Sequence, residues 1–208
     1  MCVEQSLIGI NTMAINQPSG RTMVYKVNVR AIVIQGLSIL VLCALIELAA
    51  GNVMERMKES LTVTLPALIV MIPPLLDLRG NINGALASRL GTALHTGVIE
   101  PRLSMSAELK VNLASSLILS FLASATIGIL SVGIGALIGK TVHITALLVI
   151  AISAGVISGI ILAALTVLVS IVSYKRGWDP DNVTAPLMAT IGDLITMVSI
   201  FLIAILAG

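Results

Sequence analysis

Long apolar stretches recur along the chain, separated by short polar connections. An α-helix rises 1.5 Å per residue, so about 20 residues cross the hydrocarbon layer of a membrane. Five stretches reach or approach that length, and the second continues directly into a polar segment. The pattern predicts an all-α fold with five transmembrane helices per chain. The five stretches are residues 31–50, 61–78, 111–138, 144–172 and 183–207.

The composition agrees with a membrane solvent. Hydrophobic residues make up 57% of the 208 residues and charged residues 11%, and the mean hydropathy is +1.08. These values lie outside the range of soluble domains. We therefore expect residues 29–208 to form one transmembrane domain. Residues 1–28 are expected to be a cytoplasmic tail, in which 20–30 forms either a short interfacial helix or a flexible lead-in.

The distribution of basic residues predicts the orientation. With a cytoplasmic N-terminus, nine of the twelve Lys and Arg residues fall on the inner side of the membrane and three on the outer side. Cytoplasmic loops carry the excess of Lys and Arg in membrane proteins. We therefore expect a multi-pass protein of the cell membrane, with a cytoplasmic N-terminus and, after five crossings, an extracytoplasmic C-terminus.

Three of the ten acidic residues fall within or at the edge of the apolar stretches, namely Glu47, Asp77 and Asp193. A charge at the centre of a membrane helix costs about 2.5 to 3.5 kcal/mol on insertion scales. Glu47 lies near the end of the first helix, where it either reaches the headgroups or faces the protein. Asp77 and Asp193 are expected to face a partner, a water-filled cavity or an ion.

The segment PPLLDLRGNINGALASRLG, residues 73–91, places polar groups in the second helix. Pro73 and Pro74 lack an N–H, so the carbonyls four residues earlier lose their helical donors, and the helix is expected to bend. Helical spacing gathers polar and small residues on one face. These are Asp77, Asn81, Gly84 and Ser88, with Gly80 beside them.

The fifth helix repeats this arrangement. Pro186 is expected to bend it and to free a carbonyl, and four further residues share its face. Two bent helices thus offer carboxylate, amide and carbonyl oxygens, which hard divalent cations such as Mg²⁺ prefer. The chain has no cluster of His or Cys that would favour a softer metal. The four residues beside Pro186 are Ala189, Thr190, Asp193 and Thr196.

Two segments together resemble a known family. PPLLDLRGNINGALASRLGTALHTG, residues 73–97, and DPDNVTAPLMATIGDLIT, residues 179–196, are similar to the membrane domain of MgtE-type magnesium transporters, and most of all to its solute-carrier relatives. The resemblance covers all five helices in order and spacing. It implies five helices per unit, with two units forming the transport path.

The same resemblance implies roles for individual residues. Asp193 matches the metal-binding aspartate of the fifth helix, and Ala189 matches the carbonyl one turn before it. Gly80 and Asn81 match the Gly-Asn pair of the second helix. Where MgtE tends to read GGNxGxQ, this chain has Arg79 before Gly80 and no Gln.

We therefore expect a divalent cation transporter or channel rather than an enzyme. Its transported ion would be Mg²⁺, although Mn²⁺, Co²⁺ and Ca²⁺ suit the same ligands. The path would be lined by the second and fifth helices, and the metal-site residues would be Asp193, Asp77, Asn81, Gly80, Ala189 and Thr190. The expected partners are the cation, the lipid bilayer and a second copy of the chain in a homodimer, with no nucleic acid. Channel, uniporter and exchanger mechanisms stay open.

Two other classes of protein compete with transport. One is a structural or assembly subunit of a membrane complex. The other is a Mg²⁺-dependent phosphotransferase, because membrane phosphatidyl-alcohol transferases also carry Asp, Gly and an Ala-Arg pair on bent helices. Such enzymes need several acids on consecutive turns, whereas Asp77 is the only acid between Glu59 and Glu100, so this alternative lacks ligands.

Small residues and two arginines complete the pattern. The third and fourth helices carry stripes of Gly, Ala, Ser and Thr at spacings of three and four, which predict close helix packing. Arg79 and Arg89 would repel a cation, so we expect them to be structural, either paired with acids such as Asp77 and Glu100 or reaching the membrane surface. The stripes are Ser116, Ser120, Ser124, Gly128, Ser131, Gly135 and Gly139, and Gly155, Gly159, Ala163, Thr166 and Ser170.

Overall fold

The structure, a computed structural model, describes residues 11–16, 22–27, 29–178 and 180–207. The chain divides into two compact units, Met1–Val41 and Leu42–Gly208. The first unit contains a hairpin of two antiparallel strands, β1 (Asn11–Asn16) and β2 (Thr22–Val27), in which Asn11 pairs with Val27.

The strand β2 lies where an interfacial helix was one expectation, and that expectation is wrong for residues 22–27. The sequence TMVYKV is rich in β-branched and aromatic residues, which favour an extended backbone. Residues 1–10, 17–21 and 28 of the predicted tail lie outside the described residues.

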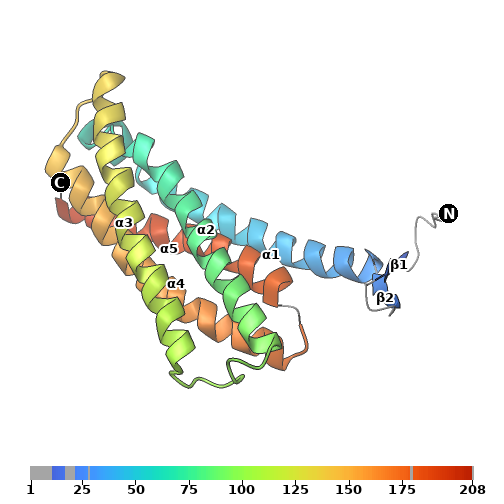
Figure 1. Cartoon of the computed structure of the whole chain (residues 1–208). Coiled ribbons are helices and arrows are strands. Elements are labelled where there is room, and N and C mark those ends of the chain that lie inside the picture. The colour runs from blue at the N-terminus through green and yellow to red at the C-terminus, as the bar shows by residue number, and fades with distance from the viewer. Residues whose placement is uncertain (1–10, 17–21, 28, 179, 208) are drawn as a thin grey trace. The chain divides into compact units, whose positions relative to one another are not determined.

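The remainder of the described chain is helical (Figure 1). Five α-helices follow the order of the five apolar stretches, and a short π-helix, η1 (Ser60–Thr64), precedes the second of them. The predicted helical fold is thus confirmed outside the hairpin. The helices are α1 (Val29–Arg56), α2 (Leu68–His95), α3 (Ala107–Leu137), α4 (Ile144–Lys175) and α5 (Pro180–Ala207).

Four of the described helices are long and apolar enough to cross a membrane, judged by length and composition. These are segments of α1, α3, α4 and α5, namely Gly36–Arg56, Ala107–Leu137, Ile144–Lys175 and Val183–Leu206. The helix α2 is outside this group because charged and amide side chains interrupt its apolar residues. Pro73 and Pro74 lie inside α2 and Pro186 inside α5, as expected, whereas the bends at these residues stay predictions.

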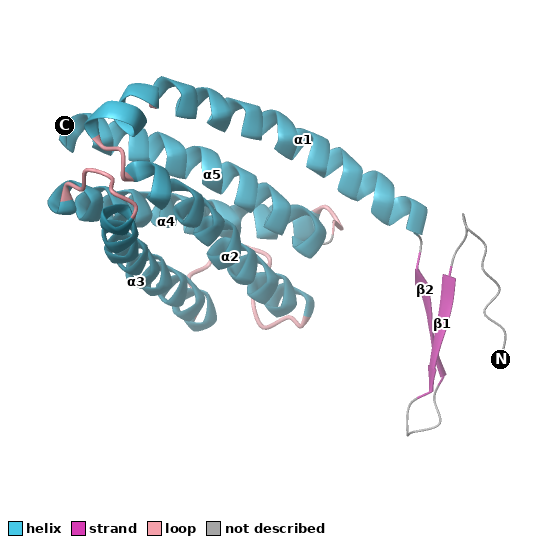
Figure 2. Ribbon diagram, turned by 90° about the horizontal axis from the view of Figure 1, so that it is seen from above, coloured by secondary structure: helices cyan, strands magenta, loops and turns pink. Residues whose placement is uncertain are grey.

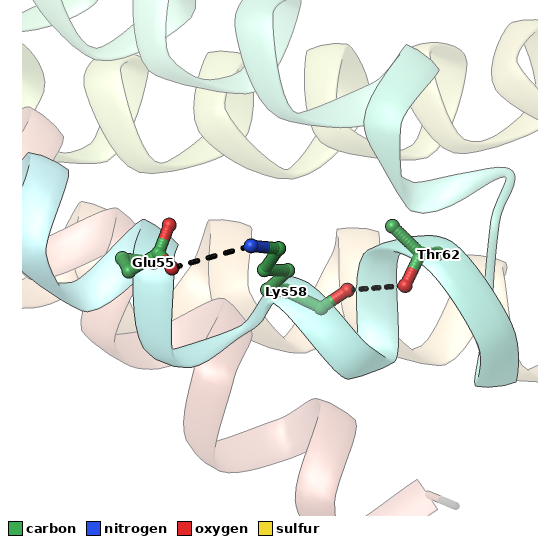
Figure 3. Close-up of polar contacts among 3 residues, drawn as sticks. All are labelled: Glu55, Lys58 and Thr62. Carbon is green, nitrogen blue, oxygen red and sulfur yellow. Dashed lines mark hydrogen bonds and ion pairs between the residues drawn. The ribbon is translucent and has the colours of Figure 1, made fainter.

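The connection between α1 and α2 is held mainly by apolar burial. The side chains of Met57, Leu61 and Leu65 are buried in the main apolar core. On the exposed side, Lys58 Nζ lies 3.6 Å from Glu55 Oε1, and Thr62 Oγ1 donates a hydrogen bond of 2.8 Å to the carbonyl of Lys58 (Figure 3). Exposed ion pairs of this kind stabilise a protein by about 0 to 1 kcal/mol.

The helices α2 to α5 pack into a bundle in which α2 contacts α3, α4 and α5, and α4 contacts α3 and α5 (Figure 2). The small-residue stripe of α4 is entirely buried, as is that of α3 from Ser116 to Gly135. A Cβ atom at Gly128 would lie 3.0 Å from Cβ of Ala151. The predicted packing seams are therefore confirmed.

An arginine lies at the centre of this bundle. Arg79 of α2 is fully buried, and its guanidinium donates hydrogen bonds to Ser120 Oγ at 3.0 Å and Ser124 Oγ at 2.9 Å on α3. Its Nε has no hydrogen-bond partner among the described residues. Arg79 thus contacts serine hydroxyls, and the expectation that it pairs with an acid such as Asp77 is wrong.

Two glycines of α4 make room for Arg79. A Cβ at Gly155 would lie 2.0 Å from Ser124 Oγ and 3.2 Å from Nη2 of Arg79, and a Cβ at Gly159 would lie 3.3 Å from Nη1. Arg79 and its two serines therefore occupy space that any larger residue on α4 would take.

We predict that Gly155→Ala lowers the melting temperature of the detergent-solubilised protein. The added methyl group collides with Ser124, and such overpacking costs about 1 to 3 kcal/mol. Gly133→Ala on α3 is the matched control, because a Cβ there meets nothing within 4 Å; it should leave the melting temperature unchanged or raise it slightly. Equal melting temperatures for the two variants in thermal unfolding would contradict this packing.

Candidate functional site

The helix α2 has an exposed polar face on the side opposite Arg79. This exposed polar face comprises Asp77, Asn81, Ser88 and Thr92, which follow one another at helical spacing and are all exposed. Within it, Asn81 Nδ2 donates a hydrogen bond of 2.9 Å to Asp77 Oδ2. That bond orients the amide and leaves the carbonyl oxygen of Asn81 and the second oxygen of Asp77 available to a ligand.

A close contact joins α2 to α5 beside this face. A Cβ atom at Gly80 would lie 3.4 Å from Cβ of Ala189, and one at Gly192 would lie 3.1 Å from Cβ of Arg79. Small residues therefore let the two helices approach closely at two successive levels. The contact brings together two residues that the family resemblance assigned to the site, Gly80 and Ala189, and positions Asp193 near α2.

Asp193 is half-buried and lies in an acidic environment. The carboxylates of Glu47 and Asp77 are both near enough to act on its charge. The three acids found in the apolar stretches thus gather in one region. That Asp77 and Asp193 hold one ion together stays a prediction.

The sequence pattern does not assign Glu47 to the site, because contact with lipid headgroups accounts for a carboxylate near the end of the first helix equally well. The side chain is exposed on α1, and its charge acts on Asp193. The signal that identifies Glu47 is the same one that identified the other two acids, namely a carboxylate within an apolar helix.

Thr190 is placed differently from the other predicted residues. It is buried, and its Oγ1 donates a hydrogen bond of 3.2 Å to the carbonyl of Pro186. Its hydroxyl is therefore used within α5. Of the six predicted site residues, it is the one least available to an ion on the exposed polar face of α2.

The polar groups of one chain are suited to binding a cation through its water molecules. Among the described residues, no three His, Cys, Asp or Glu side chains lie close enough together to hold a metal ion. The site offers dispersed carboxylate and amide oxygens instead. Mg²⁺ loses its water reluctantly and is commonly bound through one or two carboxylates and several waters, so this spacing fits a hydrated ion.

Comparison with known proteins identifies the family of the chain. Residues 72–203 match the MgtE family, described as "Divalent cation transporter". The chain is 29% identical to solute carrier family 41 member 3 of Rattus norvegicus over 137 residues, which cover 62% of this chain and 29% of that protein.

Two further relatives are solute carrier family 41 member 2 proteins. The one from Xenopus laevis is 28% identical over 158 residues, covering 72% of this chain and 27% of that protein. The one from Homo sapiens is 32% identical over 135 residues, covering 62% of this chain and 23% of that protein. The chain thus aligns with less than a third of the length of each relative.

The matched residues include both segments that carry the resemblance, residues 73–97 and 179–196, together with the helices between them. The resemblance to MgtE and to its solute-carrier relatives is confirmed. The chain therefore belongs to the MgtE family of divalent cation transporters, and not to the phosphotransferases that its α2 motif also resembles.

Proposed function

We propose that the chain moves a divalent cation, with Mg²⁺ as its main substrate, across the cell membrane along a path lined by α2 and α5. The path contains Asp77, Asn81 and Asp193, with Glu47 as a fourth polar group. The backbone carbonyl of Ala189 and the close approach of the helices at Gly80 complete the site.

The observation that carries the proposal is the exposure of charged and amide groups on α2. Asp77 and Asn81 are exposed, although α2 lies among helices that are long and apolar enough to cross a membrane. Lipid cannot hydrate a carboxylate, so such a face persists only against water or protein. A water-filled path along α2 satisfies this constraint. With α2 counted as a crossing beside the four apolar helices, the chain crosses the membrane five times, from a cytoplasmic N-terminus.

A second copy of the chain would complete the path. One chain lacks a group of three acids close enough to hold an ion among its described residues, and its exposed polar face on α2 needs a cover that excludes lipid. A two-fold axis beside this face would present two copies of Asp77, Asn81 and Asp193 to one ion. We therefore propose a homodimer with the path at or near its axis.

Prolines would adapt α2 and α5 to this path. Pro73, Pro74 and Pro186 lie inside the two helices and cannot donate to the carbonyls four residues earlier. Bends there would direct the freed carbonyls toward water in the path. Discontinuous membrane helices provide carbonyl ligands for cations in this way.

We predict that Asp193→Ala reduces Mg²⁺ uptake into proteoliposomes at least tenfold. The variant removes the most enclosed carboxylate of the site, and a tenfold loss corresponds to only about 1.4 kcal/mol. Uptake is measured with an entrapped Mg²⁺ indicator at equal protein density. Glu55→Ala is the matched control, because Glu55 is an exposed acid at the end of α1, and it should transport as the wild type does.

Undiminished uptake by Asp193→Ala would remove Asp193 from the path. Absence of uptake by the wild-type protein, reconstituted alone and folded, would instead favour an assembly subunit over a transporter.

We also predict that two chains cross-link through the exposed polar face of α2. In a background with Cys2→Ser and Cys43→Ser, Ala85→Cys should form an intermolecular disulfide on mild oxidation in membranes, because Ala85 is exposed on this side of α2. Thr190→Cys is the control, since Thr190 is buried within the bundle. The dimeric path is contradicted if Ala85→Cys does not cross-link while the protein transports after reconstitution as a monomer.

A further inference from the structure

A pocket with a mixed polar and apolar lining lies where α2 ends and α3 begins. Its volume is about 580 Å³, and it is lined by Ser88, Arg89 and Thr92 of α2 together with Glu108 and Asn112 of α3. The pocket begins at Ser88, beyond the acids of the site. Neither the family match nor the sequence pattern assigns a role to Glu108 or Asn112.

The pocket continues the exposed polar face of α2. Ser88 and Thr92 belong to that face and also line the pocket. From Asp77 to Thr92 the face runs along 15 helical steps, or about 22 Å at 1.5 Å per residue. Exposed polar residues on one side of α2, interrupted by Gly84 and Ala85, therefore lie between Asp77 and the pocket at the helix end.

The two charged groups of the pocket, Arg89 and Glu108, have no ionic partners within the described part of the chain. The ion pairs of the described residues are Glu55 with Lys58 and Glu100 with Arg102. Arg102 lowers the pKa of Glu100 by hydrogen bonding and by its charge. Glu100 therefore pairs with Arg102 and not with Arg89, and the expected pairing of Arg89 with Glu100 is wrong.

The hydrogen bonds of Arg89 and Glu108 involve uncharged groups. Arg89 Nη2 donates a hydrogen bond of 3.2 Å to Ser116 Oγ, which fixes the guanidinium against α3. Asn112 Nδ2 donates a hydrogen bond of 3.0 Å to the backbone carbonyl of Glu108, so the carboxylate of Glu108 and the amide oxygen of Asn112 are left for a ligand.

We propose that this pocket is the mouth of the cation path, in which Glu108 attracts hydrated divalent cations and Arg89 limits how strongly they are held. The inference rests on the proposed transport function and adds two residues to it. Six waters at about 30 Å³ each occupy about 180 Å³, so the pocket accommodates a cation with its first hydration shell. A carboxylate at an open mouth raises the local concentration of cations, whereas a nearby guanidinium lowers it.

The test measures water access and electrostatic potential without relying on transport. Thr92→Cys is prepared in the background with Cys2→Ser and Cys43→Ser and reconstituted into sealed proteoliposomes. Its thiol is reacted with two membrane-impermeant methanethiosulfonates, one carrying a trimethylammonium group and one a sulfonate. Leu119→Cys on α3 is the control, because Leu119 is exposed but apolar and lies outside the pocket.

The expected result is that Thr92→Cys reacts with both reagents and Leu119→Cys with neither. Adding Glu108→Gln should lower the ratio of cationic to anionic reaction rates about threefold or more, and adding Arg89→Gln should raise it by a similar factor, because one charge at short range in water is worth about 1 kcal/mol. Both changes should shrink at high salt. Millimolar Mg²⁺ should slow the cationic reagent in a manner that depends on Glu108.

The proposal is overturned if Thr92→Cys is unreactive, or if Glu108→Gln leaves the rate ratio and the Mg²⁺ effect unchanged. Should Arg89→Gln fail to fold, the Glu108→Gln result decides alone. The outcome can be distinguished from that of the transport proposal. Loss of uptake in Asp193→Ala together with an unreactive Thr92→Cys contradicts only the mouth of the path. A reactive pocket that responds to charge, in a wild-type protein without uptake, contradicts only the transport function.

Discussion

The structure depends on the way α2 distributes polar groups over two opposite faces. One face places the guanidinium of Arg79 inside the bundle, and the other carries Asp77 and Asn81 outside it. In a hydrocarbon solvent neither face is tolerated against lipid. The inner face is covered by α3, α4 and α5, which leaves the outer face as the side where water or another protein must lie.

Burial of Arg79 explains why α3 and α4 consist so largely of small residues. A guanidinium removed from water costs several kcal/mol unless its donors are satisfied, and Ser120 and Ser124 satisfy part of them. Those serines and the guanidinium fit only because Gly155 and Gly159 leave space on α4. The stripes therefore do more than allow close backbone packing. They surround the guanidinium of Arg79, whose position fixes the rotation of α2.

Sequence spacing predicted the features that depend on one helix at a time. The buried stripes of α3 and α4 and the exposed polar face of α2 follow from a period of 3.6 residues. Features that depend on how two helices align were not predictable. The proximity of Glu47 to Asp193 requires the relative height of α1 and α5, and the serine partners of Arg79 require that of α2 and α3. Thr190 is adjacent to Ala189 on the same turn of α5, and helical spacing alone does not show which of the two faces the bundle interior. In the structure Thr190 is buried.

The fixed rotation of α2 links the buried charge to the site. Residues 77 and 79 are separated by about 200° around a helix with 3.6 residues per turn, so anchoring Arg79 within the bundle necessarily turns Asp77 away from it. Asn81 is one turn further on and holds Asp77 by its amide, while the contact between Gly80 and Ala189 sets the distance to α5. The carboxylates therefore stand at the edge of a rigid bundle and not within it. In the proposed site, such an edge would leave room for the water shell that a divalent cation retains. It would orient the acids without enclosing the ion, which suits a site that must release its cargo as readily as it binds it.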